Sequence, residues 1–250
     1  MKYALSGALA VFAAFTVAAA SASPAPAARE TVVFVEAHPD DLAGHLGTAM
    51  KLAEKFEVHV IDFTHGELGC GEEKFKSGWT RRTRTAEETE VCRRAGFKLH
   101  WCEEVDGYAY AGKAACDRLA QLFKEIKPRA VFCHWPIDVH DDHVMSAAAT
   151  LKAINLAGIK PERYFHEQDI QSRGFAPAYH VDITPYVEKK AQLARLYVCQ
   201  GGDKIVERKA ESNRVYGRNS SQRNVEVIGV FHGTVKPGGS VFDGLDGVVQ

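Results

Sequence analysis

Two short segments, about a hundred residues apart, carry the histidine and carboxylate side chains from which a metal site can be built. The first is Ala-His-Pro-Asp-Asp at residues 37–41, and the second is His-Asp-Asp-His at residues 140–143. Clusters of imidazole and carboxylate are the usual ligands of a first-row divalent metal, and a group left over can act as an acid or a base. The two segments together predict a catalytic metal centre.

The sequence around these segments indicates how they are positioned. Residues 31–35 form an apolar, β-branched run typical of a buried parallel strand, so the segment 37–41 follows its carboxyl end. Open α/β sheets bind their ligands in the crevice at that end of the strands. The second segment begins a helical stretch, in which His140 and His143, three residues apart, project from one face.

The rest of the chain predicts an α/β fold of the Rossmann-like type. In the first half, short apolar runs typical of strands alternate with stretches whose apolar residues have helical spacing. The expected helices are at 42–55, 81–95 and 113–126, and the expected strands are at 58–63, 98–102 and 130–134. This alternation predicts a three-layer sandwich with a mostly parallel sheet and helices on both faces. The second half is less regular, with strands predicted at 163–165, 179–181 and 225–231 and a helix at 185–198.

The ends of the chain predict export. Residues 1–22 resemble a signal peptide, because Lys2 precedes an apolar run and small residues at 20–22 form a cleavage site. The alternative is an uncleaved anchor, since the run is near the lower length for crossing a bilayer. Cleavage is the favoured interpretation, and it predicts a periplasmic or secreted protein without a membrane span. The expected divisions that follow are a Pro/Ala-rich tether at 23–30, the enzyme domain at 31–235 and a loose C-terminal tail at 236–250.

Composition narrows the class of protein. Without Lys2, 30 basic and 32 acidic residues leave a formal charge of −2 and no basic stripe, so nucleic acid is not an expected partner. About 228 residues without a long internal linker fit one domain. The six cysteines allow 15 disulfide pairings if they are oxidised. Because the sequence has no C-x-x-C spacing, a structural zinc site is not expected. The sequence does not specify the oligomeric state.

The residue types assign roles in a hydrolytic reaction. A hydrolytic zinc ion needs three protein ligands and an open position for water. His38, Asp41 and His143 would supply two imidazoles and one carboxylate, although the same donors accept other divalent ions such as Fe²⁺. Asp40 is then left as a general base, which takes a proton from zinc-bound water and returns it to the leaving amine.

His140 is close enough to the second segment's ligand to share the site without binding the metal. Held as an imidazolium by Asp142, His140 would donate to the oxyanion that forms when an amide carbonyl is attacked. The alternative is a fourth ligand, which would close the open position. His45 could likewise be a further ligand, and a histidine on the face of the first helix is the favoured interpretation.

Taken together, the two segments resemble the signature of the LmbE/PIG-L-like zinc-dependent N-acetylglucosaminyl deacetylases. That signature is His-Pro-Asp-Asp after the first strand and His-x-Asp-His about a hundred residues later, and it matches residues 38–41 and 140–143. The resemblance, which covers roughly 31–200, implies the same metal ligands, the same base and an oxyanion role for His140 with Asp142. It also implies substrate contacts from Arg84, in an Arg-x-x-Glu helix pattern, and from Asp106, which precedes Gly107.

Some positions depart from the family pattern. Leu42 stands where Glu is usual, and Asp141 stands where Pro is usual. Arg84 also has a simpler interpretation, an ion pair with Glu87 or Glu88 on its own helix. These departures leave the proposed ligands and base in place, and they concern the identity of the substrate.

The expected function is therefore an exported zinc-dependent hydrolase that removes the acetyl group from an N-acetylglucosamine-type sugar, free or within a glycan. Two alternatives stay open: a non-catalytic sugar- or metal-binding protein, and a metallohydrolase of another amide or an ester. A dinucleotide enzyme is not expected, because no G-x-G-x-x-G follows the first strand.

Overall fold

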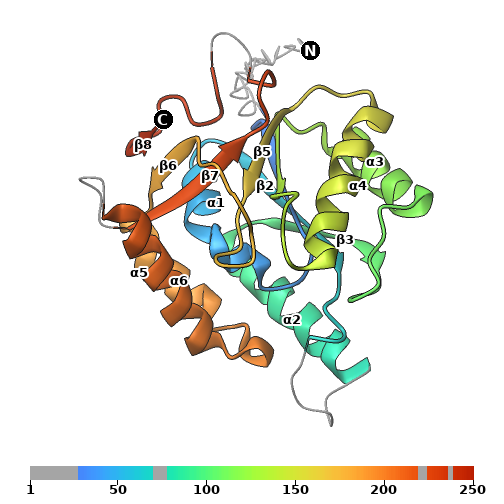
Figure 1. Ribbon diagram of the computed structural model, residues 1–250, viewed down its shortest axis with the longest axis horizontal. Helices are drawn as coiled ribbons and strands as arrows, with labels where there is room; N and C mark the ends of the chain where they lie inside the picture. The colour runs from blue at the N-terminus through green and yellow to red at the C-terminus, as the bar shows by residue number, and fades with distance from the viewer. Residues whose placement is uncertain (1–27, 70–77, 219–223, 236–238) are drawn as a thin grey trace, which may run out of the picture.

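A single eight-stranded sheet forms the centre of the computed structural model, which describes residues 28–69, 78–218, 224–235 and 239–250 (Figure 1). The strands are β1 (Thr31–Glu36), β2 (Glu57–Thr64), β3 (Lys98–Glu104), β4 (Ala130–His134), β5 (Glu162–His166), β6 (Tyr179–Asp182), β7 (Val225–Val230) and β8 (Val248–Val249). The helices are α1 (Leu46–Leu52), α2 (Gly78–Ala95), α3 (Lys113–Ile126), α4 (Asp141–Ala157), α5 (Val187–Ala194) and α6 (Gly202–Gly217). Short 3₁₀ turns lie at η1 (Asp41–Gly44), η3 (Thr184–Tyr186) and η4 (Val198–Gln200).

The strand order places a topological switch point at the centre of the sheet. The order is β3-β2-β1-β4-β5-β7-β6-β8, and the pairs from β3 to β5 are all parallel. The antiparallel pairings of β7 and β8 make these two strands run opposite to the other six. The chain winds outward in opposite directions from β1 and β4, so a crevice opens beyond the carboxyl ends of these two strands.

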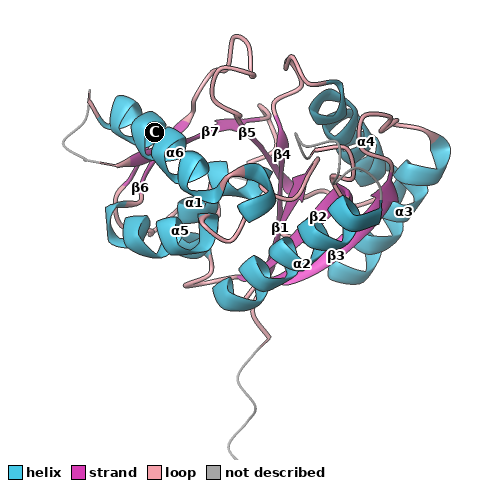
Figure 2. Ribbon diagram, turned by 90° about the horizontal axis from the view of Figure 1, so that it is seen from below, coloured by secondary structure: helices cyan, strands magenta, loops and turns pink. Residues whose placement is uncertain are grey.

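Both faces of the sheet are buried, and β1 shows why its sequence is apolar at every position. Val32 and Phe34 pack into a core with side chains of α1, α2, α5 and α6, whereas Val33 and Val35 pack into a core with α3 and α4. Figure 2 shows α3 and α4 on one side of the sheet and the other helices across it. A strand buried on both faces loses the polar alternation of a half-exposed strand. The predicted mostly parallel α/β sandwich is confirmed.

The element boundaries agree best with the prediction in the first half of the chain. The helix at 113–126 and the strand at 130–134 have the predicted bounds. The single helix predicted at 42–55 is instead the turn η1 followed by the short α1, and the helix predicted at 185–198 is divided among η3, α5 and η4. Helix α6 and strand β8 were not predicted.

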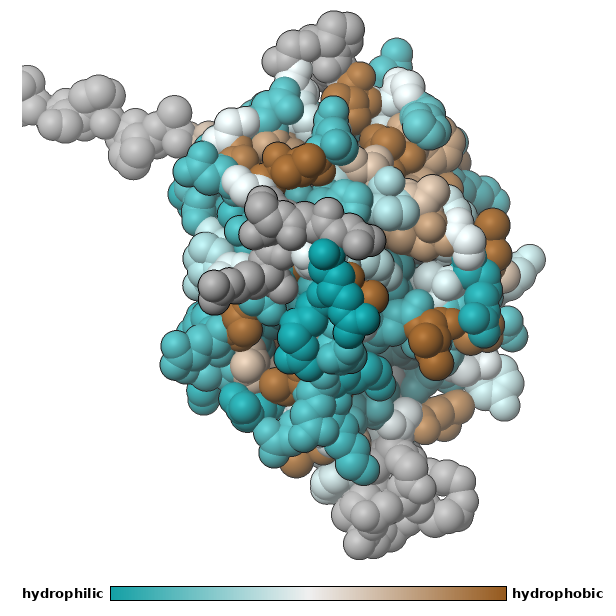
Figure 3. Space-filling model, turned by 60° about the vertical axis from the view of Figure 1, so that its left-hand side comes forward, coloured by the Kyte–Doolittle hydropathy of each residue, from teal (hydrophilic) through white to brown (hydrophobic). Residues whose placement is uncertain are grey.

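Helix α6 lies on a largely hydrophilic surface. Its side chains Arg208, Glu211 and Arg214 are each more than half exposed. Figure 3 shows polar side chains across much of this face, with apolar residues in small, separate groups. Within the part of the chain that the structure describes, no helix has both the length and the hydropathy needed to cross a bilayer.

The C-terminal segment packs against the domain. Residues 236–250 were predicted as a loose tail, but Val241, Phe242 and Leu245 are buried in the core, and β8 pairs with β6. The tail is therefore ordered over its described part. The predicted signal peptide and residues 23–27 of the tether lie outside the described residues.

Four of the cysteines are buried in the two cores. Cys92, Cys102, Cys116 and Cys133 are free thiols, and burial raises the pKa of each. Cys133 lies within β4, in agreement with its prediction as a small buried hydrophobe. These four residues form no disulfide with one another.

Candidate metal centre

The three predicted metal ligands meet at the switch point of the sheet. His38 and Asp41 follow β1, and His143 lies in the first turn of α4, which follows β4. One ligand atom from each of these residues lies within 4.8 Å of the others. All three side chains are buried, with exposed fractions of 7%, 8% and 2%. Two imidazoles and a carboxylate at this spacing form a donor set that suits zinc and similar divalent ions.

Asp41 is the centre of this group. Its Oδ2 lies 3.2 Å from His38 Nδ1 and 3.5 Å from His143 Nε2, and it accepts a hydrogen bond of 2.9 Å from the His38 backbone N–H. Burial opposes the ionisation of Asp41, but the neighbouring His143, with hydrogen bonds from His134 and His38, holds its pKa well below the usual range. Asp41 is therefore an ionised carboxylate, the form that binds metal.

His38 faces carboxylates through both ring nitrogens. Its Nε2 lies 3.0 Å from Asp142 Oδ2 and 3.3 Å from Asp106 Oδ1, and its Nδ1 faces Asp41. Burial favours the neutral ring, but hydrogen bonds to Asp106, Asp142 and Asp41 raise its pKa well above the ordinary value. In the metal-free arrangement a proton on His38 supplies the positive charge that these carboxylates require. A divalent cation would supply the same charge, so the surroundings fit a metal.

Asp40 lies beside the ligands in an unusual backbone conformation. Its φ of 102° is in the left-handed region, which a non-glycine residue rarely adopts and which costs about 1–3 kcal/mol. Burial raises the pKa of Asp40, the Arg84 guanidinium opposes this, and the Asp41 carboxylate adds to the rise. The net effect moves the pKa upward, toward the range in which a carboxylate acts as a general base.

Arg84 contacts the loop that carries the metal ligands. Its Nη2 donates to Asp40 Oδ1 and to the Pro39 carbonyl, and its Nη1 donates to the Gly66 carbonyl at 3.0 Å. The side chain is only 3% exposed. Arg84 therefore fixes the position of Asp40 from α2, rather than pairing with its own helix, and it also lines the cavity in which a substrate contact was predicted.

The Asp142 carboxylate was predicted to hold His140, and ligand atoms of the two side chains do lie within 4.8 Å of each other, but its hydrogen bond is to His38. The Asp142 carboxylate contacts His38 and accepts hydrogen bonds from the Gly107 and Ala109 backbone amides, at 2.7 and 3.2 Å. His140 instead caps α4, because its Nδ1 accepts from the Asp142 N–H at 3.3 Å. Burial and the neighbouring His38 lower the pKa of His140. Its ring is therefore neutral with the proton on Nε2, which can still donate to an oxyanion.

Asp106 lies within the site, where a sugar contact was predicted. Its Oδ2 accepts a hydrogen bond of 2.8 Å from the Leu68 backbone N–H, and its Oδ1 faces His38. Although burial raises the pKa of Asp106, its hydrogen bond with His38 lowers it to about 2. The carboxylate is ionised and already positions His38.

Asp138, which the sequence analysis missed, contacts a predicted ligand from behind. Its Oδ1 lies 3.2 Å from His143 Nδ1 and accepts from the His140 backbone N–H at 2.9 Å. Its Oδ2 accepts from Ser172 Oγ at 2.8 Å. Metal-binding histidines commonly donate their other ring N–H to a carboxylate, which fixes the orientation of the ring. An acid two residues before the second segment was the sequence signal for this role.

A second missed contact supports the loop after β1 from the C-terminal half. Gln168 Nε2 donates to the Asp41 carbonyl at 2.9 Å, and Lys209 Nζ on α6 donates to Gln168 Oε1 at 3.0 Å. Lys209 also pairs with Asp169 at 2.8 Å. These contacts join α6 to the backbone of a predicted metal ligand.

The site opens into a cavity of about 230 Å³. The residues that line it are His38, Asp40, Asp41, Gly69, Arg84, Asp106, His140, His143, Gln171, Gln200 and Arg208. The lining is strongly polar. Gly69 shows that the loop after β2 borders the site, and residues 70–77 of this loop lie outside the described part.

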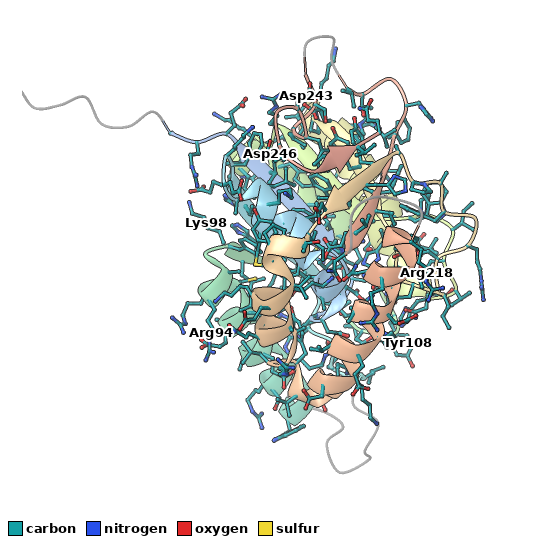
Figure 4. The ribbon with its side chains drawn as sticks, turned by 90° about the vertical axis from the view of Figure 1, so that its left-hand side faces the viewer. Arg94, Lys98, Tyr108, Arg218, Asp243 and Asp246 are labelled. Carbon is teal, nitrogen blue, oxygen red and sulfur yellow. The ribbon has the colours of Figure 1, made fainter. Side chains whose placement is uncertain are left out.

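Three aromatic residues in the loop after β3 and at the start of α2 are exposed. Tyr108 and Tyr110, in the loop after β3, are 78% and 68% exposed, and Trp79 at the start of α2 is 39% exposed. Figure 4 labels Tyr108 at the outer surface of the molecule, as it does Arg94 and Lys98. None of the three aromatic residues belongs to the described lining of the cavity.

The comparison with protein families identifies the segment that contains both motifs. The model of the PIG-L family, described as GlcNAc-PI de-N-acetylase, matches residues 33–154. This span begins in β1 and ends in α4, so it includes all three predicted ligands and Asp40. Residues 33–154 therefore form a PIG-L family domain. The expected family resemblance is confirmed.

Solved structures share the fold of this PIG-L protein. The match to a conserved protein from Thermus thermophilus has 24% identity and a TM-score of 0.70, and it covers 84% of this chain and 98% of that protein. The N,N'-diacetylchitobiose deacetylase from Pyrococcus horikoshii, at 23% identity and a TM-score of 0.68, covers 81% and 84%. GalB, the 4-carboxy-2-hydroxymuconate hydratase from Pseudomonas putida, at 21% identity and a TM-score of 0.64, covers 80% and 95%. The fold accommodates a hydratase as well as a deacetylase, so the reaction has to be argued from the site.

Proposed function

We propose that this protein is an exported metal-dependent deacetylase that removes the N-acetyl group from an N-acetylglucosamine-type sugar. The observation that carries this proposal is the position of Asp40 beside the donor set of His38, Asp41 and His143, in one polar cavity. The family model supports the choice of an amino-sugar amide as substrate. Two imidazoles and one carboxylate leave a coordination position for water or substrate, as in hydrolytic zinc sites.

The metal-binding residues and Asp40 have complementary tasks. A divalent ion held by His38, Asp41 and His143 would polarise the acetyl carbonyl and make water more acidic. Asp40 accepts the proton from the attacking water and later delivers it to the amine that leaves. Its Oδ1 is held by Arg84, so Oδ2 is the oxygen that exchanges the proton.

His140 and the remaining charged groups act on the substrate. His140 lines the cavity, and its protonated Nε2 donates to the developing oxyanion. Arg84 holds Asp40 in its strained conformation and lines the cavity. Asp106 keeps His38 oriented, and its presence in the cavity lining supports a contact between its carboxylate and sugar hydroxyls.

The size of the cavity favours recognition of one sugar unit. Ligand pockets for drug-sized molecules are about 300–1,000 Å³, so 230 Å³ accommodates an acetamido group and the ring that carries it rather than a longer chain. Any further part of a glycan would extend past the cavity. We therefore propose a terminal acetylated amino sugar as the reacting unit.

We propose zinc as the ion and export as the destination. The ligand types suit zinc, although Fe²⁺ would be accepted by the same donors. Export follows from the composition of residues 1–22, which has a basic residue, an apolar run and a small-residue cleavage site. Secretion of the full-length chain from a bacterial host, with the new N-terminus read by mass spectrometry, tests export separately from activity.

The central experiment is an acetate-release screen. The chain from residue 23 onward, loaded anaerobically with defined amounts of Zn²⁺ or Fe²⁺, is incubated with N-acetylglucosamine, its oligomers and other amides and esters. Acetate and free amine released in equal amounts from an acetylated amino sugar support the proposal. Sugar binding without turnover indicates a binding protein, and turnover of another amide or an ester alone indicates a different hydrolase.

A further inference from the structure

A second group of histidines surrounds a carboxylate directly behind the candidate metal centre. Glu36 ends β1, His45 precedes α1, His134 ends β4 and His166 ends β5. Their exposed fractions are 0%, 2%, 0% and 1%. We call these four residues the Glu36 group. Nothing in the proposed deacetylase reaction uses them.

The geometry of the Glu36 group is that of a cation site. His45 Nε2 lies 2.6 Å from Glu36 Oε1, which fixes the carboxylate. The other oxygen, Oε2, lies 3.4 Å from His166 Nε2 and 3.7 Å from His134 Nε2. Ligand atoms of Glu36, His134 and His166 all lie within 4.8 Å of one another.

Several polar atoms of the group lack a hydrogen-bond partner among the described residues. These atoms are Glu36 Oε2, both ring nitrogens of His166, and the Nδ1 atoms of His134 and His45. Buried polar groups in folded proteins almost always have a partner, and a neutral imidazole must place its proton on one nitrogen. Two of these atoms, Glu36 Oε2 and His166 Nε2, lie 3.4 Å apart, so a cation bound between them would satisfy both.

We propose that Glu36, His134 and His166 bind a second divalent first-row metal ion, adjacent to the ion of the catalytic pocket. One carboxylate and two imidazoles are the same donor types as in the first site. His45 does not bind the ion, and it orients Glu36 by its hydrogen bond to Oε1.

His134 connects the two sites. Its Nε2 lies 3.3 Å from Asp41 Oδ2, and its ring stacks on that of His143 at a centroid distance of 4.2 Å. Nε2 also accepts a hydrogen bond of 3.0 Å from the Ala37 backbone N–H. A metal bound at Nε2 replaces this hydrogen bond, whereas a metal bound at Nδ1 leaves it intact.

Metal counting tests the proposal without reference to turnover. The chain from residue 23 onward is stripped with a chelator, reconstituted separately with excess Zn²⁺ or Co²⁺, desalted and analysed for metal per chain. Wild type is expected to hold about two ions. Glu36→Gln, which keeps the shape of the side chain, and His166→Asn are each expected to lose one ion, and His143→Gln is expected to lose the other.

Asp62→Asn is the matched control. Asp62 is paired with Glu36 across β1 and β2, is fully buried and has two carboxylate oxygens without a described hydrogen-bond partner, but it belongs to no histidine cluster. This variant is expected to keep both ions. Circular dichroism and melting curves identify variants that do not fold. If either Glu36→Gln or His166→Asn fails to fold, the other substitution still tests the second site.

The outcomes are distinct. The second site is supported if one ion is lost in Glu36→Gln and in His166→Asn but kept in Asp62→Asn. The absorption spectrum of bound Co²⁺ should also lose one component in Glu36→Gln and in His166→Asn. One ion in wild type that is unchanged in Glu36→Gln overturns it. Loss of all metal in Glu36→Gln also overturns it, because Glu36 would then only support the first site. Acetate release is not used, so failure of the proposed function would leave this result unaffected.

Discussion

The carboxylates in the pocket and those just behind it respond to burial in opposite ways. Burial favours the neutral form in both regions, but hydrogen bonds and charges from histidines keep the pKa values of Asp41 and Asp106 below the ordinary range. Behind the pocket, burial raises the pKa of Glu36 at the end of β1. Farther from the pocket, burial raises the pKa of Glu88 to about 7. The pKa values of the two regions differ because different side chains contact the carboxylates, not because the carboxylates are buried to different depths.

This contrast indicates where the molecule uses charge. The pocket holds ionised carboxylates next to histidines that share protons with them, a state that a cation can replace directly. In the interior, Glu88 accepts a hydrogen bond from the Cys92 thiol instead of from a histidine, and burial raises its pKa. Glu36 combines features of both regions: histidines contact it, as in the pocket, and burial raises its pKa, as in the interior.

The largest expected effect tests whether Asp40 acts chemically. Asp40→Asn should lower kcat by about 10²–10⁴-fold, because the amide cannot accept the proton, while the bound metal stays unchanged. Acetate release and metal content are measured on the same sample. Asp117→Asn, at an exposed ion pair on α3, is the control and should have wild-type activity. Turnover near wild type in Asp40→Asn would contradict the base assignment.

Metal removal tests whether the pocket carboxylates need a cation. At a free zinc concentration about 1,000 times the Kd, binding adds about 4 kcal/mol to the free energy of unfolding. For a chain of this size the melting temperature should then fall by roughly 10 °C on chelation. Calorimetry with and without Zn²⁺ measures the change. An equal melting temperature in both states would show that the donor set does not bind zinc in this range.

Asp138→Asn tests whether the orientation of a ligand matters. The substitution removes the charge that faces His143 Nδ1 and should weaken metal affinity or activity by about 10–100-fold. Competition with a zinc-binding dye gives the affinity. Asp138→Glu should recover part of it if the carboxylate, rather than the shape of the loop, is responsible. Unchanged affinity in both variants would remove Asp138 from the site.

The last prediction concerns the stability of the fold and an acid of the interior. The folded-state pKa of Glu88 is raised from 4.5 to about 7 by burial, so the folded protein keeps a proton that the unfolded chain has released between these values. Stability should therefore fall as pH rises from about 4.5 to about 7, by up to about 3 kcal/mol. Glu88→Gln should flatten this part of the profile, as measured by urea unfolding at pH 5 and pH 8. The same slope in both proteins would show that Glu88 is already ionised.

The first half of the fold and the meeting of His38, Asp41 and His143 were predictable because their signals are local. The strand of residues 130–134 is apolar throughout, and the helix of 113–126 has regular apolar spacing. The ligands His38, Asp41 and His143 follow strands of that regular half. Parallel strands bring such residues together once the topology is known.

The missed features depend on contacts between distant residues. Helix α6 buries Lys209 and Asn213 as well as Ile205, so its buried face is not apolar and its periodicity is hidden. The pairing of Asp142 with His38 rather than His140 joins residues 104 positions apart. Strand β8 is too short for a propensity signal and exists because β6 offers it an edge.

The hydrogen bonds from Gln168 to Asp41 and from Lys209 to Gln168 set an order for the maturation of the protein. Synthesis proceeds from the N-terminus, so every first-site ligand leaves the ribosome before the side chain that supports the Asp41 backbone and well before α6. A nascent chain that has reached residue 154 has the complete matched family segment but an unsupported loop. An ion bound by the three predicted ligands would therefore reach its final geometry only at the last stage of folding, after the whole polypeptide has been made.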